Sequence, residues 1–498
     1  MVIVFVLVGV AALAVLGGFH WYAWRRLVRD TTAGPGTARR VGAALFVAGP
    51  LLMLAAVVSE RAGAPFWLQR TLGWPGFLWM ALALYLLLAL LAGELVRPLL
   101  RRALDHRAAT RRTAGTEAVA DSGTDSGTDS GTDSGTDSGT DSGTDSGTDS
   151  GTDSGTDSGT EAVAHGTTVG VHRTPGVSAS TEPAPKEPSA TKHTEPAAPG
   201  QPGEPRGSGE PLGTAAPVGG PLAAPSRRLF VSRVVGGAVA AAAVGTVGYG
   251  TYGVLRGPAV KRVTVPLAKL PRSAHGYRIA VVSDIHLGPV LGRGFAQKVV
   301  DTINSTQPDL IAVVGDLVDG SVKNLGPAAA PLAGLRARHG AYFVTGNHEY
   351  FSGAAQWVRE VRELGIHPLE NARTELAGFD LAGVNDVQGE SEGHGPDFDR
   401  ALGDRDTARA CVLLAHQPVQ IHDAVRHGVD LQLSGHTHGG QLWPGNLVAA
   451  AANPTVAGLE RYGDTQLYVS RGAGAWGPPT RVGAPSDITV VELASREA

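Results

Sequence analysis

Four stretches of the chain contain no Asp, Glu, Lys or Arg and are long enough to cross a lipid bilayer, which takes roughly 20 apolar residues. They are residues 2–24, 41–59, 71–93 and 234–255 of a chain of 498. Trp21, Trp24 and Trp74 lie near the ends of these stretches, where aromatic side chains gather at membrane surfaces. The sequence therefore predicts membrane-spanning helices, three of them in residues 1–98. A cleaved signal peptide is the alternative for the first stretch, but no basic residue precedes it.

Positive charge between the spans predicts their orientation, because short loops rich in Lys and Arg stay in the cytoplasm. The loop after the first span contains five arginines, the loop after the second contains two, and six follow the third. This pattern places the N-terminus and everything after Arg256 outside the cytoplasm. We therefore expect a multi-pass protein of the cell membrane with an extracytoplasmic C-terminal domain.

Residues 99–226 consist mainly of Gly, Ser, Thr, Pro, Ala and Asp, and the tetrapeptide DSGT is repeated ten times over residues 121–160. Such a stretch cannot bury enough apolar surface to fold, so we predict a disordered linker. The ten aspartates of the repeat account for the acidic balance of the chain, which has 42 Lys and Arg, 46 Asp and Glu, and a net charge of -4. This balance excludes a strongly basic nucleic-acid-binding protein, and we expect no nucleic-acid partner.

The linker ends in Ser226-Arg227-Arg228, directly before the fourth apolar stretch. This run resembles a twin-arginine export signal, so one interpretation of residues 227–256 is a segment recognised by the twin-arginine export machinery. The other is an ordinary fourth transmembrane segment with its positive charges in the cytoplasm. No small-residue cleavage pattern closes the segment, so we expect it to remain as an anchor in both cases.

Residues 257–498 alternate short β-branched runs with stretches of helical periodicity, which predicts an α/β domain. We expect strands at residues 277–283, 310–315, 341–345, 411–415 and 431–434, and helices at 295–305, 354–364 and 419–426. Polar residues follow each expected strand. Because ligands gather at the carboxyl ends of strands in open α/β sheets, these polar residues are the candidates for a functional site.

The spacing of three of these residues predicts that they meet. Asp284, Asp316 and Asn347 are separated by 32 and 31 residues, about the length of one strand-helix unit, so they should lie side by side at one sheet edge. In addition, His286 and His438 follow Asp284 and His436 at the i, i+2 spacing that points both side chains the same way from an extended backbone.

Oxygen ligands combined with imidazoles favour divalent transition metals over magnesium or calcium. The single cysteine, Cys411, excludes a four-cysteine zinc site, so any metal must be held mainly by His, Asp, Glu or Asn. The pattern predicts a site for two metal ions.

Five sequence blocks, D-x-H, G-D, G-N-H-E, H and G-H-x-H, resemble in type and order the motifs of the calcineurin-like metallophosphoesterase superfamily. They fall at residues 283–288, 315–320, 346–350, 415–418 and 435–441. The motif sequences S-D-I-H-L-G, G-N-H-E-Y and G-H-T-H-G-G-Q are most similar to those of the membrane-associated bacterial branch. The members of that branch are twin-arginine-exported or transmembrane phosphoesterases. The resemblance implies an α/β/β/α sandwich, in which two sheets pack face to face between helices.

The resemblance also implies a role for each motif residue. His348 would be the catalytic residue that donates a proton to the leaving oxygen or stabilises it. The metal ions would be Mn, Fe or Zn, and a hydroxide bridging them would attack phosphorus in line. The implied ligands are Asp284, His286 and His438 for one ion, Asn347, His416 and His436 for the other, and Asp316 for both.

Several charged residues near the motifs have two possible roles. Asp319 and Asp386 either support the metal ligands or cap a turn, and capping is the commoner role of Asp. Glu349 either orients His348 or pairs with an arginine. Arg471 and Arg481 are candidates for binding substrate phosphate, although solvated ion pairs are the commoner fate of arginine.

Two aromatic residues and the cysteine complete the candidates. Trp443 and Trp476 either line a groove for an acyl or sugar group or pack in the core, and core packing is the favoured interpretation. Cys411 is expected as a small residue of the core.

The sequence thus predicts a membrane-anchored phosphoesterase that uses two divalent metal ions to hydrolyse a phosphodiester, phosphomonoester or pyrophosphate bond. Membrane tethering favours a lipid-linked substrate. The alternative from another functional class is a catalytically silent, metal-dependent membrane sensor or scaffold. His348 argues against that alternative, because a scaffold needs no proton donor at a leaving group.

Overall fold

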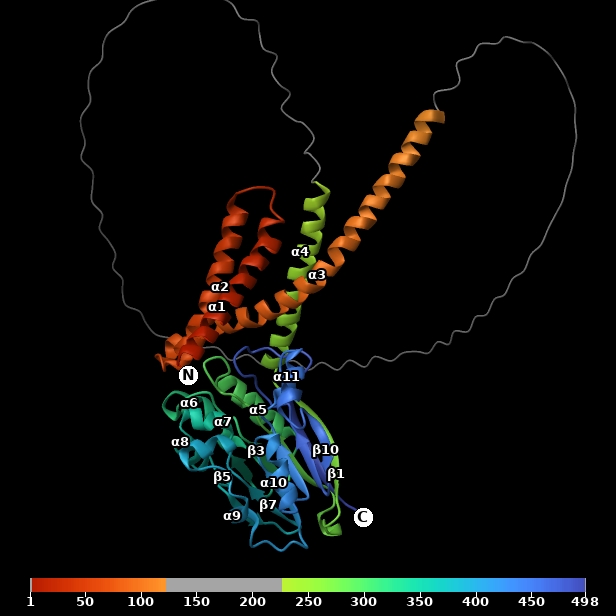
Figure 1. The fold of residues 1–498 in the computed structure, drawn as a ribbon. Helices are drawn as coiled ribbons and strands as arrows, with labels where there is room; N and C mark the ends of the chain where they lie inside the picture. The colour runs from red at the N-terminus through yellow and green to blue at the C-terminus, as the bar shows by residue number, and fades with distance from the viewer. Residues whose placement is uncertain (1, 122–225, 498) are drawn as a thin grey trace, which may run out of the picture. The chain divides into compact units, whose positions relative to one another are not determined.

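The computed structural model describes residues 2–121 and 226–497. The DSGT repeats beyond Asp121 and the rest of the predicted linker up to residue 225 lie outside the described residues. The described part of the chain contains four helices long and apolar enough to cross a membrane, and each overlaps one of the predicted spans. They are α1 (Val2–Trp24), α2 (Thr37–Arg61), α3 (Phe66–Asp121) and α4 (Arg227–Leu255), with a short π-helical segment, η1 (Arg25–Arg29), after α1 (Figure 1).

Helix α3 is longer than the sequence pattern indicated. We predicted that the linker begins at residue 99, whereas α3 continues to Asp121. Residues 99–121 are rich in Ala, Arg and Leu, which have high intrinsic helix propensity. A helix therefore extends beyond the apolar span, because helix propensity favours it there although large apolar residues are scarce.

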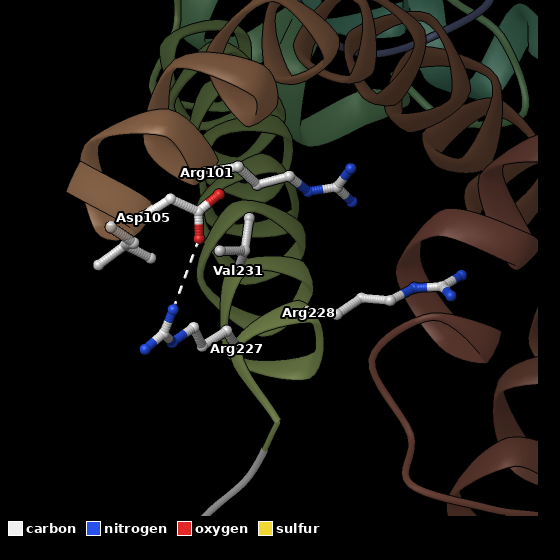
Figure 2. A pocket seen from close by; sticks show the side chains of 6 residues that line it. Arg101, Asp105, Arg227, Arg228 and Val231 are labelled. Atoms are coloured by element: carbon white, nitrogen blue, oxygen red, sulfur yellow. Dashed lines mark ion pairs between the residues drawn. The ribbon is translucent and has the colours of Figure 1, made fainter. Parts of the chain in front are cut away.

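The Ser226-Arg227-Arg228 run forms the beginning of α4. The Ser226 hydroxyl caps the helix by accepting a hydrogen bond from the backbone N–H of Leu229 (3.3 Å). Arg227 forms an ion pair with Asp105 of α3 (3.6 Å), and both residues line a pocket of about 260 Å³ (Figure 2). The arginine pair is thus the first turn of a packed helix, close to the extended part of α3.

The C-terminal domain contains two six-stranded sheets, as an α/β/β/α sandwich requires (Figure 1). In spatial order, the first sheet consists of β1 (Ala259–Leu267), β12 (Asp487–Ser495), β2 (Tyr277–Val282), β3 (Leu310–Val314), β4 (Ala341–Val344) and β5 (Ile366–Pro368). The second consists of β10 (Gly458–Tyr462), β11 (Thr465–Val469), β9 (Leu431–Ser434), β8 (Ala410–Leu414), β7 (Phe379–Gly383) and β6 (Ala372–Glu375).

Short helices connect the strands. The α-helices of the domain are α5 (Arg293–Ser305), α6 (Val322–Ala329), α7 (Asn347–Ser352), α8 (Ala354–Glu363), α9 (Phe398–Leu402), α10 (Ile421–Arg426) and α11 (Gly445–Ala452). The 3-10 turns are η2 (Arg272–Ala274), η3 (Ala330–Gly334), η4 (Val387–Glu392), η5 (Pro418–Gln420) and η6 (His438–Gly440).

The buried apolar residues form three layers that match this architecture. Val299 of α5 and Trp357 of α8 pack with the outer face of the first sheet. Residues such as Leu310 and Leu431 fill the space between the sheets, and α9 and α10 cover the second sheet. Since β3 is covered on both faces, all five of its residues are buried, which explains why it is a continuous apolar run. The predicted α/β/β/α sandwich is confirmed.

The membrane helices contact this domain, and the described residues up to Ala118 and from Ser226 onward belong to one compact unit. The Tyr85 hydroxyl on α3 donates a hydrogen bond to the carbonyl oxygen of Trp443 (3.0 Å). Phe66, at the beginning of α3, packs against the core beside the first sheet. The hydroxyl groups of Thr251 on α4 and Thr480 are 2.7 Å apart.

Candidate metal centre

The seven predicted metal ligands lie directly after five strands, at the carboxyl ends where the loops of the two sheets converge. The first sheet supplies Asp284 and His286 after β2, Asp316 after β3, and Asn347 at the beginning of α7 after β4. The second sheet supplies His416 after β8, and His436 and His438 after β9.

The structure brings these side chains together in two groups that share one carboxylate. The ligand-capable atoms of Asp284, His286, Asp316 and His438 all lie within 4.8 Å of one another, as do those of Asp316, His416 and His436. Asn347 joins the second group, because its Oδ1 is 2.9 Å from His436 Nδ1. The buried Asp and His side chains fit the binding of divalent metal ions.

Five of the seven residues have a left-handed backbone, which is uncommon for any residue but glycine, so the extended backbone expected at the two i, i+2 pairs is wrong. The φ angles are 51° at Asp284, 48° at His286, 52° at Asp316, 71° at His436 and 53° at His438. A residue in this conformation costs roughly 1–3 kcal/mol, and such residues cluster at functional sites. This concentration of strain is independent of the motifs and points to the same residues.

Two glycines of the motifs are required by close approaches of the loops. A Cβ atom on Gly346 would lie 2.3 Å from Asp316 Oδ1, and one on Gly315 would lie 2.5 Å from His416 Nδ1. Gly315 also has a φ of 73°, which disfavours other residues. The glycines of G-D and G-N-H-E therefore allow the loops after β3 and β4 to approach the ligands.

The contacts of the two ring nitrogens of His416 show whether this residue suits a metal ion. Its Nδ1 lies 2.8 Å from the carbonyl oxygen of Val314 and donates to it, which leaves Nε2 as the ring nitrogen that a metal ion would bind in exchange for a proton. That Nε2 is buried and has no hydrogen-bond partner among the described residues, although Asp316 Oδ2 is 3.1 Å away. A buried imidazole nitrogen beside a carboxylate, with no other partner, is the arrangement that a metal ion completes when it replaces the ring proton.

The charges of the ligands are strongly coupled. Burial alone would raise the pKa of Asp316, but the positive charge of protonated His416, whose Nε2 lies 3.1 Å from Asp316 Oδ2, outweighs burial and holds that pKa well below its usual range. Burial raises the pKa of Asp284 and lowers the pKa of His436 to about 4. Near neutral pH, His436 is therefore an uncharged imidazole, the form that binds metals.

Asp319 supports two histidines of the site. Its Oδ1 lies 2.8 Å from His286 Nδ1 and 2.7 Å from His348 Nδ1. Burial would raise the pKa of Asp319, but the charges and hydrogen bonds of His286 and His348 lower it to about 2. Asp319 is thus an ionised carboxylate that orients both rings, and of its two possible roles the contacts favour support of the metal ligands over a turn cap.

His348 is held between carboxylates. Its backbone N–H donates to Asp316 Oδ1 (2.9 Å), and its Nδ1 faces Asp319. Burial by itself lowers the pKa of His348, but the hydrogen bond and charge of Asp319 outweigh burial and raise the pKa to about 9. His348 therefore holds a proton at neutral pH.

Glu349 has neither of the roles expected from sequence. It is fully buried, and its carboxylate accepts hydrogen bonds from the backbone N–H groups of Gly346 (Oε2, 2.6 Å), Asp316 (3.0 Å) and Leu317 (2.8 Å). Burial, followed by the charge of Asp316, raises the pKa of Glu349 to about 7. Glu349 joins the loops after β3 and β4, which carry Asp316 and Asn347. A lone acidic residue in a motif gives no sequence signal for contacts of this kind.

The remaining charged candidates, Arg481, Arg471 and Asp386, each contact a different part of the domain. Arg481 is buried and donates hydrogen bonds to the carbonyl oxygens of His438 (3.0 Å) and Gly474 (2.6 Å), so its guanidinium positions a predicted ligand. Arg471 lies 3.8 Å from Asp487, as an ion pair. Asp386 caps η4 by accepting from the backbone N–H of Gln388 (2.8 Å).

The prediction that Trp443 and Trp476 pack in the core is wrong. Trp443 and Trp476 are 53% and 51% exposed, because the loops that carry them lie at the surface rather than between the sheets. The Trp476 ring centroid is 5.6 Å from that of His348. Cys411, in contrast, is buried in β8, as expected.

Comparison with known proteins supports the interpretation of the motifs. The profile of the calcineurin-like phosphoesterase family matches residues 277–440, a region that begins with β2 and includes all seven predicted ligands. A transmembrane protein with a metallophosphoesterase domain from Danio rerio is 38% identical over 259 residues, which cover 49% of this chain and 59% of that protein. A protein of the same description from Bos taurus is 41% identical over 253 residues, covering 47% and 57%.

The chain thus spans less than two-thirds of the length of these two vertebrate relatives, and the similarity is not confined to bacteria. An uncharacterized metallophosphoesterase from Aquifex aeolicus is 35% identical over 239 residues, which are 47% of this chain and 91% of that protein. Together with the sandwich fold, these matches establish that the chain belongs to the calcineurin-like metallophosphoesterase superfamily.

Proposed function

We propose that this protein is a membrane-anchored phosphoesterase that uses two divalent metal ions to hydrolyse a phosphodiester, phosphomonoester or pyrophosphate bond. The observation that carries the proposal is that two adjacent groups of Asp and His side chains, all buried except the partly buried His436, share Asp316. A shared carboxylate between two ligand sets is the arrangement that holds two cations close together.

Asp284, His286 and His438 would hold one ion, and Asn347, His416 and His436 the other, with Asp316 contacting both. When bound, the ions would supply Lewis acidity that activates water and neutralises the charge developing on the phosphate. The residues around them keep the imidazoles in position. Val314 fixes His416 through its carbonyl oxygen, and Asp319 fixes His286.

We assign the proton of the leaving group to His348. Hydrolysis forms a bond between phosphorus and the oxygen of water and breaks the bond to the leaving oxygen, which must then take up a proton. His348 is protonated at neutral pH and is only 14% exposed. Asp319 holds Nδ1 of His348, so Nε2 is the atom that delivers the proton.

The positions of the loops favour an extracytoplasmic catalytic domain. Phe66, just after the α2–α3 corner, packs against the core of the domain. At the other end of the helices, the guanidinium of Arg233 near the beginning of α4 donates to the carbonyl oxygen of Thr31 in the arginine-rich loop (3.0 Å). The domain and the arginine-poor loop therefore share one side, and the positive-inside rule makes it the outer side.

A fusion experiment tests this topology. Alkaline phosphatase, which folds only after export, should be active when fused after Ala498, and a fluorescent protein that folds only in the cytoplasm should be dark there. The opposite pair of results would reverse the orientation. We further propose that α4 remains as an anchor, since its first turn contacts α3 through Arg227 and Asp105.

Activity and metal content can be measured on the full-length protein in detergent. We expect hydrolysis of bis(p-nitrophenyl) phosphate with added manganese, loss of activity after chelation, and recovery when a divalent transition metal is returned. Metal analysis should give two ions per chain. Protein that contains its metal and hydrolyses no phosphoester with any divalent ion would support the sensor or scaffold alternative instead.

A further inference from the structure

An uncharged apolar surface lies next to the metal centre. Residues 439–459, directly after His438, contain no Asp, Glu, Lys or Arg. They include α11, which has no buried residue in the described part of the chain. Leu447 and Val448 of α11 are 66% and 73% exposed, and Trp443 is 53% exposed. Adjacent exposed apolar side chains of this kind mark a surface that another apolar phase covers.

The same segment is attached to the membrane helices. The carbonyl oxygen of Trp443 accepts the hydrogen bond from Tyr85 of α3. Leu442 and Val482 pack against the hydrophobic cluster of the membrane helices, and the backbone N–H of Trp443 donates to Val482 (2.9 Å). These contacts hold α11 beside the helices that cross the bilayer, so the phase nearest to its apolar residues is the membrane itself.

In the other direction, the segment reaches the catalytic site. The Gln441 side-chain amide donates to the carbonyl oxygen of Trp476 (2.9 Å) and accepts from the Trp476 backbone N–H (3.0 Å). The rings of Trp476 and Phe351 each have their centroid 5.6 Å from that of His348, and Phe351 is 66% exposed. Exposed apolar side chains thus lead from α11 to His348.

We propose that α11 and Trp443 insert into the headgroup region of the bilayer, and that Trp476 and Phe351 receive the first apolar part of a lipid whose phosphoester is cleaved. Tryptophan and short apolar helices favour this region of a membrane. This substrate class rests on the proposed phosphoesterase function. Water supplies the new P–O bond, the bond to the leaving oxygen breaks, and the leaving oxygen takes its proton from His348.

Membrane insertion is tested by labelling the full-length protein in lipid nanodiscs of phosphatidylethanolamine and phosphatidylglycerol. A Leu447→Cys variant carries an environment-sensitive fluorophore, and Val425→Cys on α10, which is also an exposed apolar position (38%), is the matched control. The native Cys411 is fully buried, so it should not react, and labelling of the unmodified protein checks this.

We expect nitroxide-labelled lipid to quench the label at position 447 and aqueous iodide to quench the label at position 425. Equal quenching of both labels by iodide would overturn the insertion of α11. This measurement involves no catalysis, so its result stands whether or not the protein is a phosphoesterase.

The lipid substrate is tested with two esters that share a leaving group. Soluble bis(p-nitrophenyl) phosphate reports the metal site, and p-nitrophenyl hexadecyl phosphate in the nanodisc reports access from the membrane. In the double variant Leu447→Glu and Val448→Glu we expect KM for the hexadecyl ester to rise at least about tenfold, because two apolar side chains no longer enter the membrane, with unchanged turnover of the soluble ester. Val425→Glu should change neither reaction.

The outcomes separate the two proposals. No hydrolysis of the soluble ester by the metal-loaded wild type would overturn the proposed function. Hydrolysis of the soluble ester together with an unchanged KM for the hexadecyl ester in the double variant would overturn only the membrane route to the site.

Discussion

The two sheets of the catalytic domain contribute different chemistry to the site. The first sheet supplies every predicted oxygen ligand, Asp284, Asp316 and Asn347, whereas the second supplies only imidazoles. Neither sheet holds all the predicted ligands of one ion, because the group with Asp284, His286 and His438 and the group with His416 and His436 each combine residues of both sheets through Asp316 and His438. A centre divided in this way exists only when the sheets are packed together, so metal binding should stabilise their packing as well as enable chemistry.

The largest effect should come from Asp316, which belongs to both ligand groups. Asp316→Ala should lower kcat for bis(p-nitrophenyl) phosphate by about 10³-fold or more, since several kcal/mol of charge stabilisation depend on the metal pair. Metal analysis should find fewer than two ions per chain. Asp301→Ala on the surface of α5 is the control, and a variant of Asp316 that keeps both ions and full activity would refute the shared-ligand arrangement.

His348→Asn separates catalysis from metal binding on the first sheet. His348 follows β4 of that sheet, and we do not assign it as a ligand. Both metal ions should remain, while kcat falls by about 10²-fold or somewhat more through loss of the proton donor. Turnover of esters with good leaving groups should suffer least. Loss of metal instead of loss of turnover would assign His348 to the ligands, and His422→Asn, at an exposed position, controls for surface changes.

Asp319→Asn should have a smaller effect, about 10- to 100-fold on activity, as is usual for the hydrogen-bond partners of a site. It should also change the pH profile. His348 has a raised pKa of about 9, so its protonated form is present below that pH and is lost as pH rises through it. Without the Asp319 charge, burial lowers this pKa, and the alkaline fall in kcat should move to lower pH. An unchanged alkaline limb would contradict the pairing of the two residues.

Glu349→Gln should affect stability more than chemistry. The carboxylate accepts three buried backbone hydrogen bonds, and an amide group cannot accept all of them, so we expect a loss of about 1–3 kcal/mol. The apparent melting temperature of the metal-loaded protein measures the effect. Glu363→Gln, at an exposed position on α8, should change stability by less than about 0.5 kcal/mol. Equal melting temperatures would mean that the loops do not depend on Glu349.

Sequence patterns located the five strands that precede the motifs, and missed three further inner strands, β7, β11 and β12, as well as the edge strands. The predicted strand at residues 310–315 is β3 (Leu310–Val314), and the one at 431–434 is β9, because buried parallel strands are continuous apolar runs. β1 and β12, which form a nine-residue parallel pair, were not predicted. β1 is largely exposed, and β12 lies at the opposite end of the domain's sequence, so only the folded sheet identifies them as neighbours.

The roles of the supporting residues were also beyond the sequence. Asp319 resembled a turn residue, Glu349 a partner of His348, and Trp476 a core residue. Each of these side chains takes its role from a segment distant in sequence, such as Glu349 from the loop after β3. Local spacing carries no information about such contacts.

The sequence by itself determined the four apolar helices, the family, and the seven candidate ligands, because bilayer thickness and metal preference act on residue type and short spacing. Only the tertiary structure decided how the two sheets divide the ligands, which backbones adopt the left-handed conformation, and that α11 presents Leu447 and Val448 to its surroundings. These features depend on which distant segments pack together. Packing is a property of the whole folded chain, and no local pattern records it.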